Sequence, residues 1–350
     1  MKRILSMLMI LVLCAALMSA CGVSEPSSVV MSSSSEVSAQ AVSPAPPVEE
    51  APTEKPVMRV AALKGATTMG MVQLIENGES GEAANEYAFS IGTIDETVPM
   101  LAKGEIDAAA LPANLASVIY NNTNGAYQVA AINTLGVMYV LEKGDTISSV
   151  EDLRGKTIYS IGKGAVPEFA VNYVLSQRGI DPASDVELEY KSEAAEILPL
   201  LMQQESAIAV LQQPFVSNAL ARVEGLRVAL DWSEEWDAVA GGKSELITGV
   251  VVVRREFAEQ NPEAVSRFLE EYKESVAFVN SQPAEAAVLI EKYGIVAAEI
   301  AEKAIPASNI VFVDGENAKS SLMGYLEVLF EQNPQSVGGT LPDDDFYYLQ

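Results

Sequence analysis

The stretch Arg59-Val60-Ala61-Ala62-Leu63-Lys64-Gly65-Ala66-Thr67-Thr68-Met69-Gly70-Met71 decides the fold prediction. Its residues 60–63 form a short apolar run of the kind found in buried strands. A glycine-containing loop follows, and apolar side chains at 71, 74 and 75 then have helical spacing. The order strand, glycine loop, helix predicts the first unit of an α/β fold.

The same alternation continues along the chain. Further strands are predicted at residues 87–91, 106–111, 129–132, 137–141, 157–161, 186–190, 207–211 and 248–253. One more strand is predicted to end at residue 230. Helices are predicted at residues 96–103 and 193–204, and two more are predicted to begin after residue 112 and near residue 167. Helices also follow the last strand to the end of the chain, at 262–276, 283–293 and 322–332. Because strands alternate with helices, we expect right-handed crossovers and mostly parallel sheets flanked by helices.

The strand pattern restarts after Gly136, which indicates two lobes. A chain of 350 residues is also longer than the roughly 100–200 residues usual for one domain. The final helices bring too few strands for a third unit, so we expect them to cover the first sheet. The predicted boundaries are 57–136 with 246–350 for lobe I and 137–245 for lobe II, joined by two crossing strands.

The amino terminus has the features of a lipoprotein leader. Lys2 and Arg3 precede an apolar stretch, and small residues come directly before Cys21. We therefore expect a signal peptide at 1–20, a lipid on Cys21, and a disordered Ser/Pro-rich tether at 21–56. The alternative is an ordinary signal peptide with an accidental cysteine.

Composition excludes several classes of function. The chain has 22 basic and 48 acidic residues, which gives a formal charge of −26. We therefore do not expect nucleic acid as a partner, and we expect the protein to be a soluble monomer. It contains no histidine, which removes histidine-based catalytic relays and histidine-ligated metals. Cys14 leaves with the leader, so Cys21 has no disulfide partner. We expect no catalytic residues, no metal and no cofactor.

Loops at the carboxyl ends of parallel strands converge on a crevice, and helix amino termini point their free amides toward it. Hydroxyls, amides and backbone N–H groups in these loops suit a polar or mildly anionic ligand. The predicted ligand-binding residues are Thr67, Thr68, Met69, Asn114, Tyr139, Lys163, Gly164, Gln212, Gln213, Trp232 and Thr248.

Two of these candidates have an alternative interpretation. Trp232, with Tyr139, could stack on a flat heterocycle, but the spacing of Trp232 and Trp236 equally suits two core residues on one helix. Lys163 could sense an anionic group or lie in solvent. Neither glycine loop has the pattern of a nucleotide-binding loop.

Several motifs, in this order, resemble the solute-binding proteins of ABC importers, in the group that binds thiamine precursors, nitrate, sulfonates and taurine. The motifs are the loop 64–71, the turn 104–107, the segments 149–156 and 212–215, and the helix start 261–263. The resemblance covers about residues 57–350. It implies a two-lobed periplasmic-binding-protein-like type II fold that closes around a small ligand. Family members often have an acidic residue where this chain has Gln213, which disfavours a cationic ligand.

The leading hypothesis is a lipid-anchored receptor on the extracytoplasmic face of the membrane. It captures a small organic solute, such as a heterocyclic vitamin precursor or a sulfonate-like anion, and delivers it to a permease with its ATPase. The alternatives are an enzyme on the same fold, similar to the dehydratases of the menaquinone pathway, and a ligand sensor without a transporter.

Overall fold

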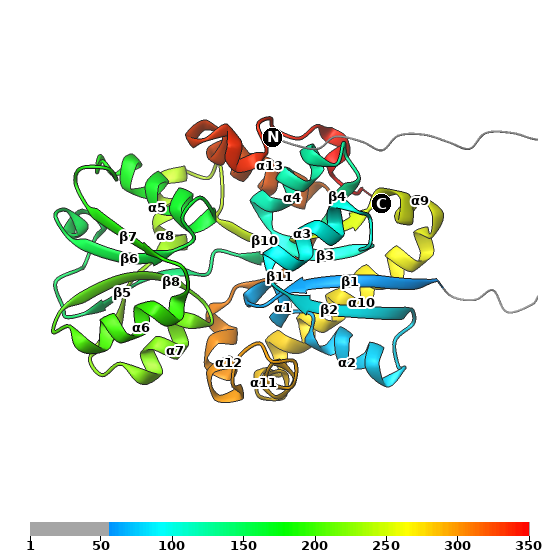
Figure 1. The fold of residues 1–350 in the computed structure, drawn as a ribbon, viewed down its shortest axis with the longest axis horizontal. Helices are drawn as coiled ribbons and strands as arrows, with labels where there is room; N and C mark the ends of the chain where they lie inside the picture. Colours follow the sequence, from blue (N-terminus) through cyan, green and yellow to red (C-terminus); the bar gives the residue numbers. More distant parts are fainter. Residues whose placement is uncertain (1–55, 350) are drawn as a thin grey trace, which may run out of the picture. The chain divides into compact units, whose positions relative to one another are not determined.

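The computed structural model describes residues 56–349. The predicted leader, Cys21 and the tether up to residue 55 lie outside the described residues. Within 56–349 the chain forms two sheets, each flanked by helices (Figure 1). This mixed α/β architecture confirms the predicted fold class.

The first sheet has six strands in the order β11-β4-β10-β3-β1-β2. The strands are β1 (Val57–Leu63), β2 (Glu86–Gly92), β3 (Ala108–Pro112), β4 (Tyr127–Leu135), β10 (Ile247–Arg254) and β11 (Ile310–Asp314). Strand β1 pairs in parallel with β2 and β3, whereas β10 is antiparallel to both β3 and β4. The uniformly apolar run in β10 serves two cores, because Val250 and Val252 pack on one face of the sheet and Val251 and Val253 on the other.

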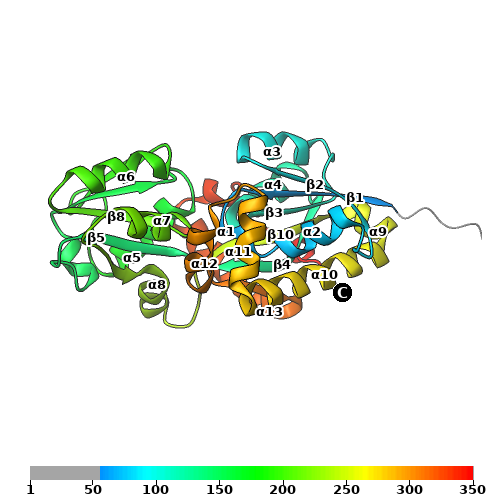
Figure 2. The same ribbon diagram turned by 90° about the horizontal axis from the view of Figure 1, so that it is seen from below.

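Helices cover both faces of this sheet. On one face lie α2 (Val72–Ser80), α9 (Arg255–Gln260), α10 (Pro262–Ser281), α11 (Pro283–Lys292) and α12 (Ala298–Ala304). The other face carries α3 (Ile94–Ala102), α4 (Ala113–Asn122) and α13 (Gly315–Gln332). Helices α2, α10 and α11 pack against one another (Figure 2). We call this sheet and its helices the first lobe.

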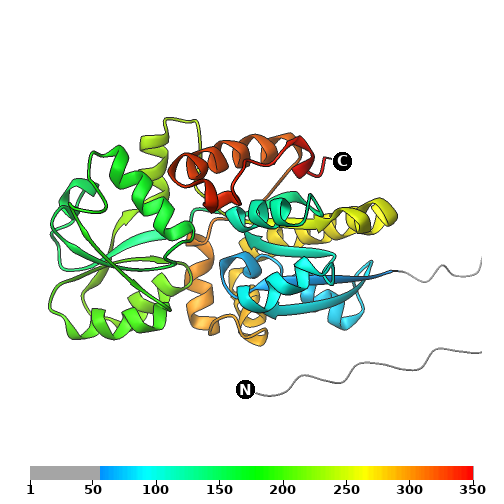
Figure 3. The ribbon, with the colours of Figure 1, turned by 45° about the horizontal axis from the view of Figure 1, so that its top comes forward.

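The second sheet has five strands in the order β7-β6-β8-β5-β9. They are β5 (Met138–Lys143), β6 (Thr157–Ile161), β7 (Glu187–Lys191), β8 (Ala207–Gln212) and β9 (Leu226–Asp231). One face is covered by α5 (Val166–Gln177) and α8 (Trp232–Ala240), the other by α6 (Ala194–Gln203) and α7 (Phe215–Arg222), as Figures 1 and 3 show. We call this sheet and its helices the second lobe.

The chain passes between the sheets twice. It leaves the first sheet through Gly136 and Val137, which connect β4 to β5, and returns through residues 241–246 to β10. The return segment runs close to α13, where the Cβ of any other residue at Gly324 would lie 2.5 Å from the carbonyl oxygen of Lys243. Tyr139 Oη, on β5, also donates to the carbonyl of Ala307 at 2.9 Å.

A buried ion cluster lies at one end of the first sheet, opposite the end at which the loops follow β1 and β3. It holds the strands together there. Asp107 is 1% exposed and accepts hydrogen bonds from Arg59 Nη2 at 2.7 Å and Arg254 Nη2 at 2.8 Å. Burial by itself raises the pKa of this carboxyl, but the hydrogen bonds from Arg59 and Arg254 outweigh it and hold the pKa below its ordinary value. Asp107 therefore has a structural role, joining β1, β3 and β10.

Two details differ from the sequence prediction. The sheets are more mixed than expected, because β10 and β11 run against the other four strands of the first sheet and β5 against the other four of the second. The carboxy-terminal region is not purely helical, since β11 joins the edge of the first sheet beside β4. Within residues 56–349, no helix has the length and apolar character needed to cross a membrane.

Candidate ligand-binding site

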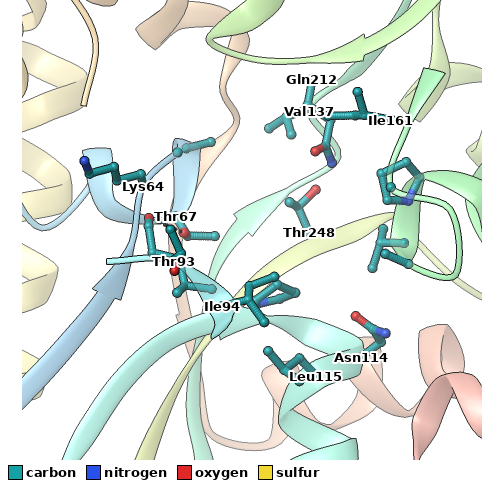
Figure 4. A pocket seen from close by; sticks show the side chains of 18 of the residues that line it. Lys64, Thr67, Thr93, Ile94, Asn114, Leu115, Val137, Ile161, Gln212 and Thr248 are labelled. Atoms are coloured by element: carbon teal, nitrogen blue, oxygen red, sulfur yellow. Dashed lines mark hydrogen bonds between the residues drawn. The ribbon is translucent and has the colours of Figure 1, made fainter. Parts of the chain in front are cut away.

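A cavity of about 560 Å³ lies where loops of both lobes meet (Figure 4). Its lining includes the residues that directly follow β1, β2, β3, β6 and β8. Val137, from the connection between β4 and β5, and Thr248, at the start of β10, complete it together with Gln335 and Ser336 near the carboxyl end. This placement at the carboxyl ends of strands is the one expected for ligand sites in α/β folds.

The polar lining is almost free of charge. Its hydrogen-bonding side chains are Lys64, Thr67, Thr93, Asn114, Gln212, Gln213, Thr248, Gln335 and Ser336. No carboxylate is among the lining residues, and Lys64 is the single cation among them. Figure 4 shows the Lys64 amino group at the edge, directed away from the other labelled side chains. An interior of amides and hydroxyls without a carboxylate offers nothing to neutralise a cationic ligand.

Five helices begin at the cavity, namely the short α1 (Ala66–Met69) together with α3, α4, α5 and α7. Three of them have a side chain at that end that bonds a backbone N–H: Glu96 in α3, Glu168 in α5, and Gln213 before α7. Of the other two, α1 has only four residues, and α4 has neither a side-chain cap at its amino terminus nor an acidic residue in its first turn. The free amides and the positive end of the α4 dipole are therefore available to a negatively polarised group.

Thr248 supplies a second, independent indication of a ligand. Its Oγ1 is inaccessible to solvent and has no hydrogen-bond partner in the structure. Figure 4 shows Thr248 between the two sets of loops, with its hydroxyl directed into the cavity. Because a buried hydroxyl without a partner is unfavourable, we predict that the hydroxyl of Thr248 completes its hydrogen bonding with a ligand.

The short helix α1, which carries Thr67, is held in place by residues of β4 and β10. Asn133, fully buried on β4, donates from Nδ2 to the carbonyl of Thr67 at 3.3 Å. Thr134 Oγ1 in turn donates to Asn133 Oδ1 at 3.1 Å. The side chain of Thr67 packs closely over Gly249 on β10, where a Cβ would also lie 2.5 Å from Asn133 Oδ1. The two strands that connect with the second lobe therefore fix the position of this helix.

The rest of the lining is apolar. It comprises Leu63, Ala66, Ile94, Pro112, Leu115, Val118, Val137, Ile161, Ala165, Val166, Pro167 and Phe215. Ile94 and Phe215 are 47% and 42% exposed, so they form apolar edges that contact with a ligand can bury. Phe215 is the only aromatic side chain of the lining.

The structure brings together six of the predicted binding residues. Thr67, Asn114, Gly164, Gln212, Gln213 and Thr248 all line the cavity. Gln213 has its Oε1 bound to the N–H and hydroxyl of Ser217, so its amide nitrogen is the atom left for a ligand. The role of these residues in binding stays a prediction.

Five predicted residues do not line the cavity. Thr68 directs its hydroxyl to the carbonyl of Leu63, and Met69 is fully buried in the core of the first lobe. The Tyr139 hydroxyl is bound to Ala307, and Lys163 is exposed. Trp232 is fully buried against α5, so the structure places it in the core and not beside a ligand.

Sequence reasoning missed six polar or edge residues of the lining, namely Lys64, Thr93, Ile94, Phe215, Gln335 and Ser336. Thr93 and Ile94 follow β2, and a signal for them was present, because Thr93 and Glu96 form a capping box directly after the predicted strand at 87–91. Gln335 and Ser336 had no such signal. They reach the cavity only because the segment after α13 folds back over α4.

Two α/β lobes, with a solute-sized cavity at the carboxyl ends of their strands, define a periplasmic-binding-protein-like fold. The chain belongs to the NMT1/THI5-like family, whose model matches residues 96–286. This membership confirms the predicted family resemblance.

Solved structures show the same fold. An ABC transporter protein from Parabacteroides distasonis matches with a TM-score of 0.70 and 24% identity, over 83% of this chain and 98% of that one. The periplasmic aliphatic sulphonate binding protein SsuA from Escherichia coli has a TM-score of 0.65 and 16% identity, over 82% and 92%. The periplasmic nitrate-binding protein NrtA from Synechocystis PCC 6803 has a TM-score of 0.52 and 13% identity, over 71% and 69%. No curated protein matches the sequence.

Proposed function

We propose that this protein is the substrate-binding lipoprotein of an ABC importer, which captures a small organic solute between two hinged lobes. The observation that carries the proposal is the cavity itself. Both lobes contribute to it, the α4 amino terminus opens onto it without a cap, and the hydroxyl of Thr248 has no partner within the protein. Proteins of similar fold include binding proteins for aliphatic sulphonates and for nitrate.

The lining favours an organic molecule with a polar or anionic end and a compact apolar body. The α4 amides and neutral hydrogen-bonding side chains suit the polar end, and the aliphatic residues suit the body. A sulfonate-like anion fits this combination. A stacked heterocycle is less well supported, because the side chains of Trp232 and Tyr139 make contacts elsewhere and Phe215 is the only aromatic ring in the lining.

Binding by loops of both lobes supports a hinge mechanism. A ligand that contacts both sets of loops stabilises the closed state more than the open state, and only this difference in affinity shifts the equilibrium. The closed form is the one that we propose is delivered to a permease with its ATPase. A lipid on Cys21 and the tether at 21–56 then hold the receptor at the extracytoplasmic face of the membrane.

The lining does not favour an enzyme. It combines amides, hydroxyls and one edge lysine, with no carboxylate to pair with an acid or base partner. The complete absence of histidine from the chain removes the side chain most often used for this chemistry. We therefore infer a binding role without turnover of the solute.

Calorimetry of the full-length protein in detergent tests the proposal. The probes are linear alkanesulfonates of increasing length, sodium nitrate, and a quaternary ammonium salt as the cationic control. We expect saturable heat with alkanesulfonates, weaker binding of nitrate, and none of the cation. Hydrogen exchange on the same samples should slow at residues 63–67 and 162–167 together. Absence of binding to every anion, or protection of one lobe alone, would contradict the proposal.

A further inference from the structure

The carboxy-terminal segment forms part of the cavity although it lies far along the chain from the other lining residues. After α13 the chain makes a short turn, η3 (Pro334–Val337), from which Gln335 and Ser336 line the cavity. The turn packs against both α13 and α4. It therefore lies beside the uncapped amino terminus of α4 described above.

Hydrogen bonds from α4 hold the η3 turn in place. Ser117 Oγ and Asn121 Nδ2 both donate to the carbonyl of Val337, each at 2.8 Å. Asn121 Nδ2 also donates to the carbonyl of Thr340 at 2.8 Å. The chain leaves the turn through Gly338, which has a φ of 91°. A Cβ added at this position would lie only 3.0–3.2 Å from atoms of Asn121 and Val118. Glycine is therefore needed for the close approach of the turn to α4.

The η3 turn also fixes the orientation of the Asn114 side-chain amide. Asn114 Nδ2 donates to the carbonyl of Ser336 at 3.1 Å. With the nitrogen engaged there, the amide oxygen is the atom that faces inward, and Figure 4 shows the Asn114 oxygen directed toward the cavity. Seen from the ligand, Asn114 is therefore a hydrogen-bond acceptor.

We propose that the η3 turn is a positioning element for specificity, which presents Asn114 Oδ1 to the ligand and selects solutes that carry a hydroxyl or amine donor in addition to their anionic end. This inference rests on the proposed function and adds to it a requirement on the ligand. A solute without a donor leaves the inward-facing amide oxygen unpaired and loses affinity.

Two probes that differ in one hydroxyl test the proposal, namely 2-hydroxyethanesulfonate and ethanesulfonate. For the full-length protein we expect the hydroxylated probe to bind about fivefold more tightly, as one additional neutral hydrogen bond allows. Gly338→Ala should displace the η3 turn from α4, free the Asn114 amide to rotate, and reduce this ratio to about one.

Gly339→Ala is the matched control. Gly339 has a similar φ of 95°, but an added Cβ there has only an ordinary contact, 3.6 Å from Gln335 Nε2. This variant should suffer the same kind of backbone strain and keep the fivefold ratio. If Gly338→Ala fails to fold, Asn114→Leu takes its place, because it removes the acceptor and should also bring the ratio to one.

The possible failures are distinguishable. If the wild-type protein binds both probes equally, or if Asn114→Leu keeps the fivefold ratio, the solute-binding function stands and the inference about Asn114 is overturned. If neither probe binds to the wild-type protein, the proposed sulfonate-like ligand is overturned and the inference falls with it.

Discussion

The indole Nε1–H of Trp232 donates a hydrogen bond to the carbonyl oxygen of Ala170 at 3.1 Å. This bond joins the start of α8 to α5 inside the second lobe, with Trp232 fully buried. Trp236 follows one turn later and is equally buried, with its ring 4.4 Å from that of Tyr173 and 5.7 Å from that of Tyr325. Because Tyr325 belongs to α13, Trp236 connects the core of the second lobe to a helix of the first.

Replacing these tryptophans should therefore change stability and not affinity. Trp232→Ala should lower the free energy of unfolding by about 3–5 kcal/mol, as loss of a large buried side chain does. The pair Trp232→Phe and Trp236→Phe isolates the hydrogen bond, because Trp236 Nε1 has no partner. We expect Trp232→Phe to cost about 1 kcal/mol more than Trp236→Phe in urea unfolding. A tenfold loss of solute affinity in folded Trp232→Phe would contradict this assignment.

Thr248→Val should separate stability from binding. The substitution removes a hydroxyl that has no partner in the protein, so the free energy of unfolding without ligand should stay the same or increase by up to about 1 kcal/mol. Affinity for the sulfonate probe should fall about fivefold, because the ligand loses a hydrogen bond. Calorimetry and urea unfolding measure the two effects. Thr248→Ser keeps the hydroxyl and serves as the control; a Val variant with unchanged affinity would remove Thr248 from the site.

Gly249→Ala should disturb the short helix α1, which carries Thr67. The new methyl group overlaps the Thr67 side chain and lies 2.5 Å from Asn133 Oδ1, so we expect a loss of about 1–3 kcal/mol in stability and weaker solute binding. Adding Thr67→Ser removes the overlapping methyl and should restore part of the stability. Urea unfolding of the two single variants and the double variant measures this coupling. Purely additive effects would show that the two residues do not press on each other.

The ion cluster at Asp107 should make stability fall in acid. The pKa of Asp107 is lowered in the folded protein, so its stabilising contribution is fully present above the unfolded value of about 3.9. That contribution is lost as the pH falls from this value through the lower folded pKa. Asp107→Asn should cost about 3 kcal/mol at neutral pH, because Arg59 and Arg254 lose their charged partner. Urea unfolding between pH 7 and pH 3 should show the difference between variant and wild type shrinking in acid; a constant difference would refute the assignment.

Cys21→Ser tests the predicted anchor. Without the thiol no lipid can be attached, so the variant should move from the membrane fraction to the soluble fraction of cells in which the wild-type protein is processed. Cys14→Ser is the matched control, because we predict that Cys14 lies within the removed leader. Fractionation followed by immunoblotting distinguishes the two. Membrane retention of Cys21→Ser would indicate another mode of attachment.

Most of the fold could be predicted because its strands are short, apolar and separated by glycine loops. The run 248–253 is an example, because a strand that is buried on both faces is a nearly continuous apolar run without polar alternation. Strand β11 could not be found in this way. Only Ile310 of its five residues is buried and its pairing with β4 is irregular, so the chain carries no periodic signal there.

The site was predictable where it follows strand ends and unpredictable where tertiary packing decides. Thr67, Asn114 and Gln212 follow predicted strands, and the general rule for α/β crevices was enough to find them. Trp232 also follows a strand, but the face that it presents depends on how α8 packs against α5, which spacing alone does not determine.

The absence of carboxylates from the cavity lining contrasts with the formal charge of −26 on the whole chain. An anionic solute must therefore diffuse through a repulsive outer field before it meets a neutral interior. Added salt screens that field over distances of about 10 Å at 0.1 M, while contacts inside the cavity are screened much less. Ionic strength should accordingly raise the association rate of an anion and leave its residence time nearly constant.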